Sequence, residues 1–343
     1  MHDLLHLTRR ALLGAIAGMA LLAAPLAALA EDDPLPSWND TPTKQAILDL
    51  VAAVTTEGGP DYVEPGDRVA TFDQDGTTWV EQPMYAQGLF AFDRLAEMAP
   101  QHPEWKDAEP FKAILSGDHA AMAKLSEKDL VEIIGVTHAG MSTADFAGLV
   151  ADWLPKSRNP ALKRGPVTEL TYQPMREVMA FLRDNGFRTY LVTGGGQEFV
   201  RVYAEDVYGV PPEQVVGSSI ATKYEIVDGK PQLLREPKIF FVDDGPGKAQ
   251  GIELFIGQRP QIAFGNSDGD RQMLEWTTAG EGRRLGLLVL HDDKDREFAY
   301  GPAGGLPDSR IGTFSQSLMD EAKGRDWRVI SMKDDWKTIF AGP

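Results

Sequence analysis

The sequence predicts an α/β fold, with a doubly wound parallel sheet, an inserted helical cap and a β-hairpin. Short apolar runs at 68–72, 189–192 and 286–290, and another that begins at Ile262, are typical of buried strands. From Pro174 onward, strand and helix patterns alternate, as in a parallel sheet whose strands are joined by helices. About a hundred residues with successive helical patterns separate the first two strands. That block is too long for an ordinary connection, so it predicts a cap.

The elements follow one another in a simple order. An N-terminal arm and helix occupy 31–67, the core comprises 68–82 and 166–343, and the cap comprises 83–165. Helical periodicity predicts helices at 43–56, 86–98, 108–115, 120–134, 143–154, 175–184 and 197–207. The strand patterns at 221–227 and 231–234, separated by Asp228-Gly229, predict the hairpin.

Composition narrows the function classes. The chain has 343 residues and 43% hydrophobic residues, which is enough for a full core. Its formal net charge is −17, so it offers no basic excess for binding a nucleic acid backbone. It contains no cysteine, which suits an oxidising compartment because no disulfide can form wrongly.

The first thirty residues predict an export signal. Arg9 and Arg10 precede a small-residue apolar run at 11–29, and Ala28-Leu29-Ala30 offers a cleavage site. The paired arginines resemble a twin-arginine signal, which implies a periplasmic protein with no stable membrane association after cleavage. An uncleaved membrane anchor is the alternative, although Pro25 and the Ala- and Gly-rich composition count against it.

The segment 71–79 carries the clearest chemical signal. Asp73 and Asp75 directly follow the first strand, where a parallel sheet opens toward its ligand. Alternation along extended chain points both carboxylates the same way, and Gly76 allows a sharp turn. Two such carboxylates can hold a divalent cation, attack phosphorus and transfer a proton. The segment therefore predicts a phosphoryl-transfer site.

These residues resemble the first motif of the haloacid dehalogenase superfamily of phosphohydrolases, Asp-x-Asp-x-Thr, at Asp73, Asp75 and Thr77. Three further segments resemble the later motifs in the family's order: Thr193 with Gly194 and Gly195 after a strand, Lys248 at the start of a helix, and the acidic turn in 262–270. Lys238 is the alternative to Lys248. The inserted cap and the hairpin resemble the phosphoserine-phosphatase-like branch, which has a Rossmann-like core.

The resemblance implies roles for these residues. Asp73 would attack phosphorus, and Asp75 would protonate the leaving group and then deprotonate water. Thr193 and the amides of Gly194 and Gly195 would bind phosphate, and Lys248 would neutralise charge. Mg²⁺ is implied as the cofactor, held by Asp73, the main-chain carbonyl of Asp75 and the turn from Asn266 to Asp270, while a small-molecule phosphate ester is the implied partner.

The fourth motif departs from the family pattern because Asn266 stands where the family has aspartate. An amide oxygen can coordinate a cation but adds no charge, so weaker magnesium binding is expected. Asp270 is the first choice for the remaining carboxylate ligand, with Asp268 as the alternative register.

Substrate recognition is less defined. Glu81 lies one residue short of the position at which phosphoserine phosphatases keep a glutamate that binds the substrate amine, and Tyr85 and His138 are further candidates. For all three, a core or surface role is the alternative. The predicted function is a magnesium-dependent phosphomonoesterase. A phosphotransferase, a dehalogenase of the same superfamily and a periplasmic binding protein are the rivals.

Overall fold

A seven-stranded sheet is the centre of the structure, a computed structural model that describes residues 33–122, 124–303 and 311–342. The strand order is β4-β3-β2-β1-β5-β6-β7, and every neighbouring pair is parallel except β3 and β4. The strands are β1 Val69–Phe72, β2 Arg188–Gly196, β3 Val215–Val227, β4 Lys230–Phe241, β5 Ile262–Gly265, β6 Leu285–Leu290 and β7 Arg328–Ser331. The predicted α/β fold class is confirmed.

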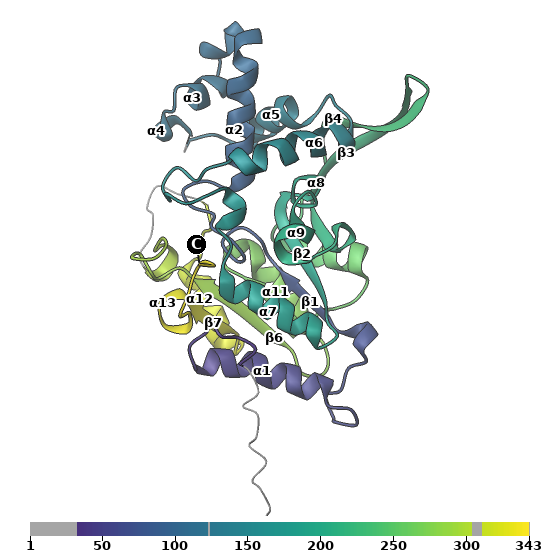
Figure 1. The fold of residues 1–343 in the computed structure, drawn as a ribbon, viewed down its shortest axis with the longest axis vertical. Helices are drawn as coiled ribbons and strands as arrows, with labels where there is room; N and C mark the ends of the chain where they lie inside the picture. The colour runs from purple at the N-terminus through teal and green to yellow at the C-terminus, as the bar shows by residue number, and fades with distance from the viewer. Residues whose placement is uncertain (1–32, 123, 304–310, 343) are drawn as a thin grey trace, which may run out of the picture. The chain divides into compact units, whose positions relative to one another are not determined.

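The described ranges contain thirteen α-helices, of which α1, α7, α11 and α12 lie beside the sheet (Figure 1). They are α1 Pro42–Thr55, α2 Ala86–Met98, α3 Phe111–Leu115, α4 His119–Met122, α5 Glu127–His138, α6 Thr143–Trp153, α7 Gln173–Asp184, α8 Gln197–Val200, α9 Ala204–Tyr208, α10 Pro246–Gly251, α11 Arg271–Thr278, α12 Gln316–Gly324 and α13 Met332–Asp335. None of the helices in those ranges combines the length and hydrophobicity that a membrane span requires. The predicted signal at 1–30 lies outside the described residues.

Side-chain alternation along the strands divides the core into two faces. Leu191 of β2 packs into one apolar cluster, together with buried residues of α1 and α7. Its neighbour Val192 packs into another, with Met273 of α11 and Leu318 of α12. Because successive side chains of a strand point to opposite faces, helices cover both sides of the sheet.

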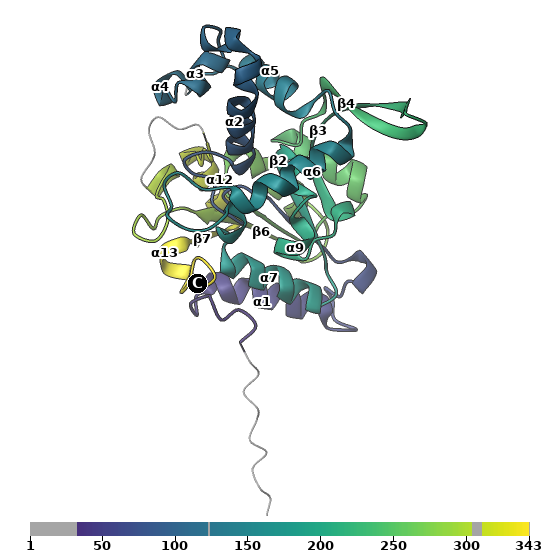
Figure 2. The same ribbon diagram turned by 45° about the horizontal axis from the view of Figure 1, so that its top comes forward.

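The cap helices lie between β1 and β2 in the chain. Figure 2 shows α2 to α5 gathered beyond the ends of the strands. They have an apolar cluster of their own, formed by Ala91, Leu95, Trp105, Phe111, Ile114 and Ile133. The chain from Pro34 to Pro343 nevertheless forms one compact unit.

Two predicted helices are each interrupted. The predicted helix at 120–134 is divided into α4 and α5, because Ser126 and Asp129 form a capping box that begins a new helix: the amide of Asp129 donates to the Ser126 hydroxyl, and the amide of Ser126 donates to the Asp129 carboxylate. The predicted helix at 197–207 is divided at 201–203, where the amides of Val202 and Tyr203 bond to carbonyls three residues back.

The hairpin prediction is confirmed, although the strands are longer than expected. Asp228 and Gly229 form the turn, with φ of 50° and 75°, which is the backbone that a tight two-residue turn requires. Strand β4 continues to Phe241, so the hairpin ends shortly before Lys248 in the sequence.

Candidate active site

The predicted motif residues meet at the carboxyl ends of β1, β2 and β5. Asp73 follows β1, and its amide donates a hydrogen bond of 2.9 Å to the carbonyl of Phe264 in β5. Gly76 turns the chain with φ of 76°, and a Cβ there would lie 2.1 Å from Nδ2 of Asn266. Only glycine fits that conformation and that space.

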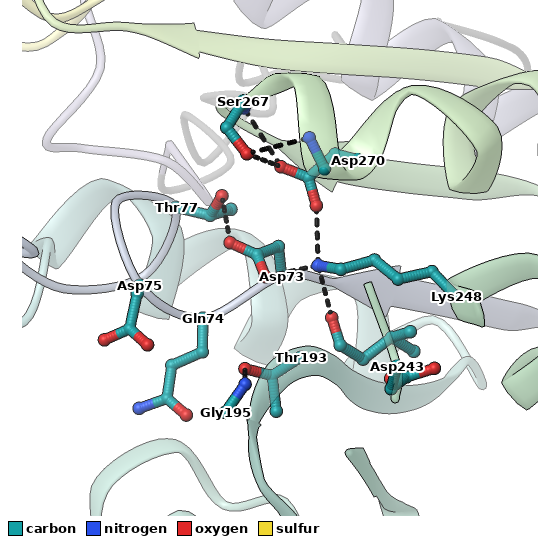
Figure 3. Close-up of polar contacts among 12 residues, drawn as sticks. Asp73, Gln74, Asp75, Thr77, Thr193, Gly195, Asp243, Lys248, Ser267 and Asp270 are labelled. Atoms are coloured by element: carbon teal, nitrogen blue, oxygen red, sulfur yellow. Dashed lines mark hydrogen bonds and ion pairs between the residues drawn. The ribbon is translucent and has the colours of Figure 1, made fainter. Parts of the chain in front are cut away.

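Lys248 connects two carboxylates beneath the site. Its ammonium donates to Oδ1 of Asp73, to Oδ1 of Asp270 at 2.6 Å and to the carbonyl of Val192 at 2.9 Å (Figure 3). The three donors of the ammonium are thus all used. Burial alone lowers the pKa of Lys248, but Asp270 and Asp73 outweigh it, and the pKa lies above its ordinary value. Lys238, by contrast, is exposed on β4.

Asp73 is buried close to another acidic side chain, Asp270. Burial raises its pKa well above the ordinary value, Asp270 raises it further, and Lys248 opposes both. Its Oδ2 accepts a hydrogen bond of 3.2 Å from the hydroxyl of Thr77. One ammonium serves two carboxylates here, so an added positive charge would favour ionised Asp73.

Asp75 has the properties of an acid and base. Burial raises its pKa to about 6, although Nε1 of Trp79, which donates to Oδ1 at 2.7 Å, lowers it. A carboxyl group with such a pKa can both release and accept a proton near neutral pH. Figure 3 shows that the Asp75 side chain points away from Lys248.

The end of β2 after Thr193 forms another side of the site. The amide of Gly195 donates to the hydroxyl oxygen of Thr193 at 3.0 Å, and Gly194 is exposed. The amide of Gly196 donates to Oε1 of Gln87 at 2.7 Å. The end of β2 is therefore tied to cap helix α2.

Gln87 also connects to His138. Because Oε1 of Gln87 is an acceptor, its Nε2 donates to Nε2 of His138 at 3.1 Å. The imidazole then carries its proton on Nδ1, which lies 2.6 Å from the hydroxyl of Thr137. Burial, and then Arg235, lower the pKa of His138 to about 3, so the ring is neutral. The sequence held no signal for Gln87.

In the fourth motif, Asn266 and Asp270 contact different parts of the site. Oδ1 of Asn266 accepts from Thr77 at 3.0 Å, while Oδ1 of Asp270 accepts from Lys248. Oδ2 of Asp270 accepts from the amides of Asn266 and Ser267 at 2.9 and 3.0 Å. Asp268 is turned elsewhere, toward the hydroxyl of Ser315 at 2.7 Å and toward Arg271.

Glu81 lies against Asn266. It is 2% exposed, and its Oε1 accepts from Nδ2 of Asn266 at 2.8 Å and from the hydroxyl of Tyr300 at 2.5 Å. Burial raises its pKa well above the ordinary value. Tyr300 was not a sequence candidate, nor was Asp243, which is fully buried near Lys248 with a pKa that burial raises to about 7.

The oxygen atoms of Asp73 and Asn266 fit a hard cation. Oδ2 of Asp73 and Oδ1 of Asn266 lie 3.2 and 3.0 Å from the hydroxyl of Thr77, whose single proton can bond one of them at a time, so the two oxygens face one small space. Carboxylate and amide oxygens are ligands that Mg²⁺ accepts. Across the described ranges, no three acidic or imidazole side chains group closely enough to hold a metal by themselves. A cation at Asp73 would therefore depend also on amide or main-chain oxygens.

A cavity of about 500 Å³ opens above these residues. Asp73, Asp75, Lys248, Thr193 and Gly194 line its floor, together with Glu81, Asp244 and Ser267. Tyr85 and His138 line it as well. The hydroxyl of Tyr85 accepts from the amide of Gly312 at 3.2 Å. The structure thus brings the predicted catalytic side chains to one opening.

Residues 70–275, more than half of the chain, match the family model for haloacid dehalogenase-like hydrolases. The chain belongs to this family. The superfamily resemblance of the four motifs is therefore confirmed, and the motif segments from Asp73 to Asp270 all lie inside the matched residues. No curated protein matches the chain.

Solved structures are similar to the chain at low sequence identity. A conserved protein of unknown function from Anaerococcus prevotii is 16% identical, with 83% of this chain and 90% of that chain covered and a TM-score of 0.50. A protein of unknown function from Bordetella pertussis is 15% identical, with 77% and 97% covered and a TM-score of 0.46. A phosphoserine phosphohydrolase-like protein from Francisella tularensis is 17% identical, with 65% and 88% covered and a TM-score of 0.37.

Proposed function

We propose that this hydrolase is a magnesium-dependent phosphomonoesterase that acts on a small phosphate ester through an aspartyl-phosphate at Asp73. The observation that carries the proposal is the pair of carboxyl groups at the cavity floor. Asp73 is held by Lys248, while Asp75 is kept near a pKa of 6. The two roles that phosphate transfer requires are therefore divided between two neighbouring side chains.

In the first step, a carboxylate oxygen of Asp73 attacks phosphorus and the bond from phosphorus to the ester oxygen breaks. Protonated Asp75 gives its proton to the departing alkoxide, which leaves as the alcohol. Lys248 fixes the attacking carboxylate, and the hydroxyl of Thr193 is placed to donate to a phosphate oxygen.

In the second step, Asp75 accepts a proton from water as that water attacks phosphorus. The bond from phosphorus to Asp73 breaks, and inorganic phosphate and the free carboxylate result. Mg²⁺, bound by Asp73, Asn266 and the main-chain carbonyl of Asp75, would neutralise phosphate charge during both steps. Asp270 then acts by positioning Lys248 and the Asn266 turn.

Phosphate release from a generic aryl phosphate tests the proposal. The purified protein should release phosphate with Mg²⁺ and not with EDTA. After an acid quench it should retain a phosphoryl label that hydroxylamine removes, because acyl phosphates react with hydroxylamine. Asp73→Asn should lose both the turnover and the label.

Four results would point elsewhere. Turnover above a few per cent in Asp73→Asn would exclude the covalent route. Halide release from a haloacid without metal would indicate a dehalogenase, and phosphate appearing on an added alcohol would indicate a transferase. Binding of phosphate esters without any turnover would indicate a binding protein.

A further inference from the structure

The cavity above Asp73 has an apolar wall. Cap helices α2 and α5, the segment between them, strand β4 and the residue after it supply apolar side chains to it, among them Phe92, Leu130, Val131, Ile239, Phe241 and Val242. The alcohol portion of a bound ester would lie against this wall, because the phosphate is held at the floor.

Four of these residues are large, apolar and exposed. Leu130 is 47% exposed, Val131 38%, Ile239 40% and Val242 53%. They come from two segments, α5 and the end of β4, that face the same opening. Exposed apolar residues that gather at one cavity usually mark a binding surface.

Arg235 and Glu81, two charged groups beside the wall, already have partners. Arg235 forms an ion pair of 3.1 Å with Glu198, and its Nε donates to the carbonyl of His138. His138 is neutral, and the carboxylate of Glu81 is bonded to Asn266 and Tyr300. Asp244 lies at the floor, near Gly194 and Gly269. The apolar wall itself therefore offers a substrate ammonium or carboxylate no partner. Among the cavity-lining residues, the carboxylate of Asp244 makes no side-chain hydrogen bond or ion pair within the described residues, and it lies at the floor and not on the wall.

We infer that the substrate is a phosphate monoester whose alcohol is mostly apolar, such as an alkyl or aryl phosphate, and not a phosphoamino acid or a sugar phosphate. The inference rests on the proposed phosphatase activity. Its physical basis is desolvation: a polar or charged alcohol would lose water against this wall and gain no partner in return. An apolar alcohol gains from the same burial.

A series of linear alkyl phosphates tests the inference. From methyl to octyl phosphate, kcat/KM should rise about fourfold for each added methylene until the cavity is filled, which corresponds to ~0.8 kcal/mol per buried CH₂. Phosphoserine and glucose 6-phosphate should lie well below butyl phosphate. A flat series, or a preference for phosphoserine, would overturn the inference.

A matched pair of variants locates the effect. Leu130→Ser removes an exposed leucine from the cavity wall, and Leu254→Ser removes an exposed leucine elsewhere, 70% exposed on the π-helix Ile252–Ile256. Leu130→Ser should lower kcat/KM for octyl phosphate several times more than for methyl phosphate, while Leu254→Ser should leave both unchanged. Equal behaviour of the two variants would contradict the assignment of this wall.

Two failures remain distinguishable. If no ester releases phosphate, the proposed function is wrong. If methyl phosphate is hydrolysed and the series is flat, only the inference on the alcohol fails.

Apolar alcohols occur in soluble esters and in lipids, so octyl phosphate below its micellar concentration should be compared with phosphatidate in phosphatidylcholine vesicles. Hydrolysis of the first alone assigns a soluble ester, and hydrolysis of both assigns a lipid phosphate.

Discussion

Nδ2 of Asn266 donates a hydrogen bond of 2.8 Å to Oε1 of Glu81, a carboxylate that is 2% exposed. This bond orients the Asn266 amide, so that its oxygen faces Thr77 and the neighbouring Asp73. The carboxyl group that the sequence lacks at position 266 is therefore present one hydrogen bond further out. Asn266 and Glu81 therefore form one hydrogen-bonded unit, in which a change at either residue affects the other.

The first prediction concerns that unit. From the sequence alone, Asn266→Asp should strengthen magnesium binding, but the structure places the new carboxylate against Glu81. Like charges that are buried together repel, so the variant should lose about 1–3 kcal/mol of unfolding free energy in EDTA. The exchange Asn266→Asp with Glu81→Gln restores one amide and one carboxylate and should recover most of that loss. Urea unfolding measures it. Strict additivity of the two single changes would contradict the pairing.

The magnesium requirement of the same variants gives the second prediction. In the exchanged double variant the carboxylate lies at 266, directly beside Asp73, and half-maximal activity should need several times less Mg²⁺ than in the wild type. Glu81→Gln alone should need more Mg²⁺ than the wild type for half-maximal activity. A magnesium titration of phosphate release checks both, and an unchanged requirement in all variants would exclude Asn266 as a metal contact.

The third prediction follows from the pKa of Asp75. As a general acid it must be protonated, so kcat/KM for an alkyl phosphate should fall as the pH rises above about 6. The Nε1 donor of Trp79 stabilises the ionised form. Trp79→Phe removes that donor, and the alkaline limb should move up by about one pH unit. A limb that moves down, or does not move, would show that another group controls it.

Asp75 also predicts a stability change. Its pKa is raised in the folded chain, so the folded state holds this proton more tightly, and stability falls as the pH rises from about 4 to 6. Asp75→Asn removes the penalty and should be more stable at pH 7 by about 2–3 kcal/mol, at ~1.4 kcal/mol per unit of pKa. The gain should disappear near pH 4. Unfolding in EDTA at both pH values measures it, and a loss of stability at pH 7 would contradict a carboxyl group whose pKa folding raises.

The fifth prediction concerns export, which we propose for residues 1–30. Replacing Arg9 and Arg10 by lysine keeps the charge but removes the paired guanidinium groups that a twin-arginine receptor reads. An uncleaved precursor should then accumulate in the cytoplasm. Cell fractionation checks it, and an unchanged periplasmic yield would indicate the general secretion route.

Local sequence patterns predicted Asp73 and Asp75 as candidates, the family resemblance added Thr193 and Lys248, and the structure brings all four to one cavity. An apolar strand followed by an acidic turn is short-range information, and parallel strands bring their carboxyl ends to one edge whatever the loops contain. The same holds for the hairpin, since Asp228-Gly229 prescribes the turn by itself. These parts of the fold and the site could be predicted before any contact was known.

Tertiary structure decided the rest. Glu81 and Tyr300 are separated by more than two hundred residues, and nothing in either segment announces that they share a hydrogen bond. The choice between Asp268 and Asp270 was open in sequence, because both lie in one turn. Which of them binds a cation stays a prediction, but the folded chain turns Asp270 toward Lys248 and Asp268 toward Ser315. The apolar wall likewise arises only when α5 and β4 meet, because long-range packing, unlike strand and turn patterns, leaves no local trace in the sequence.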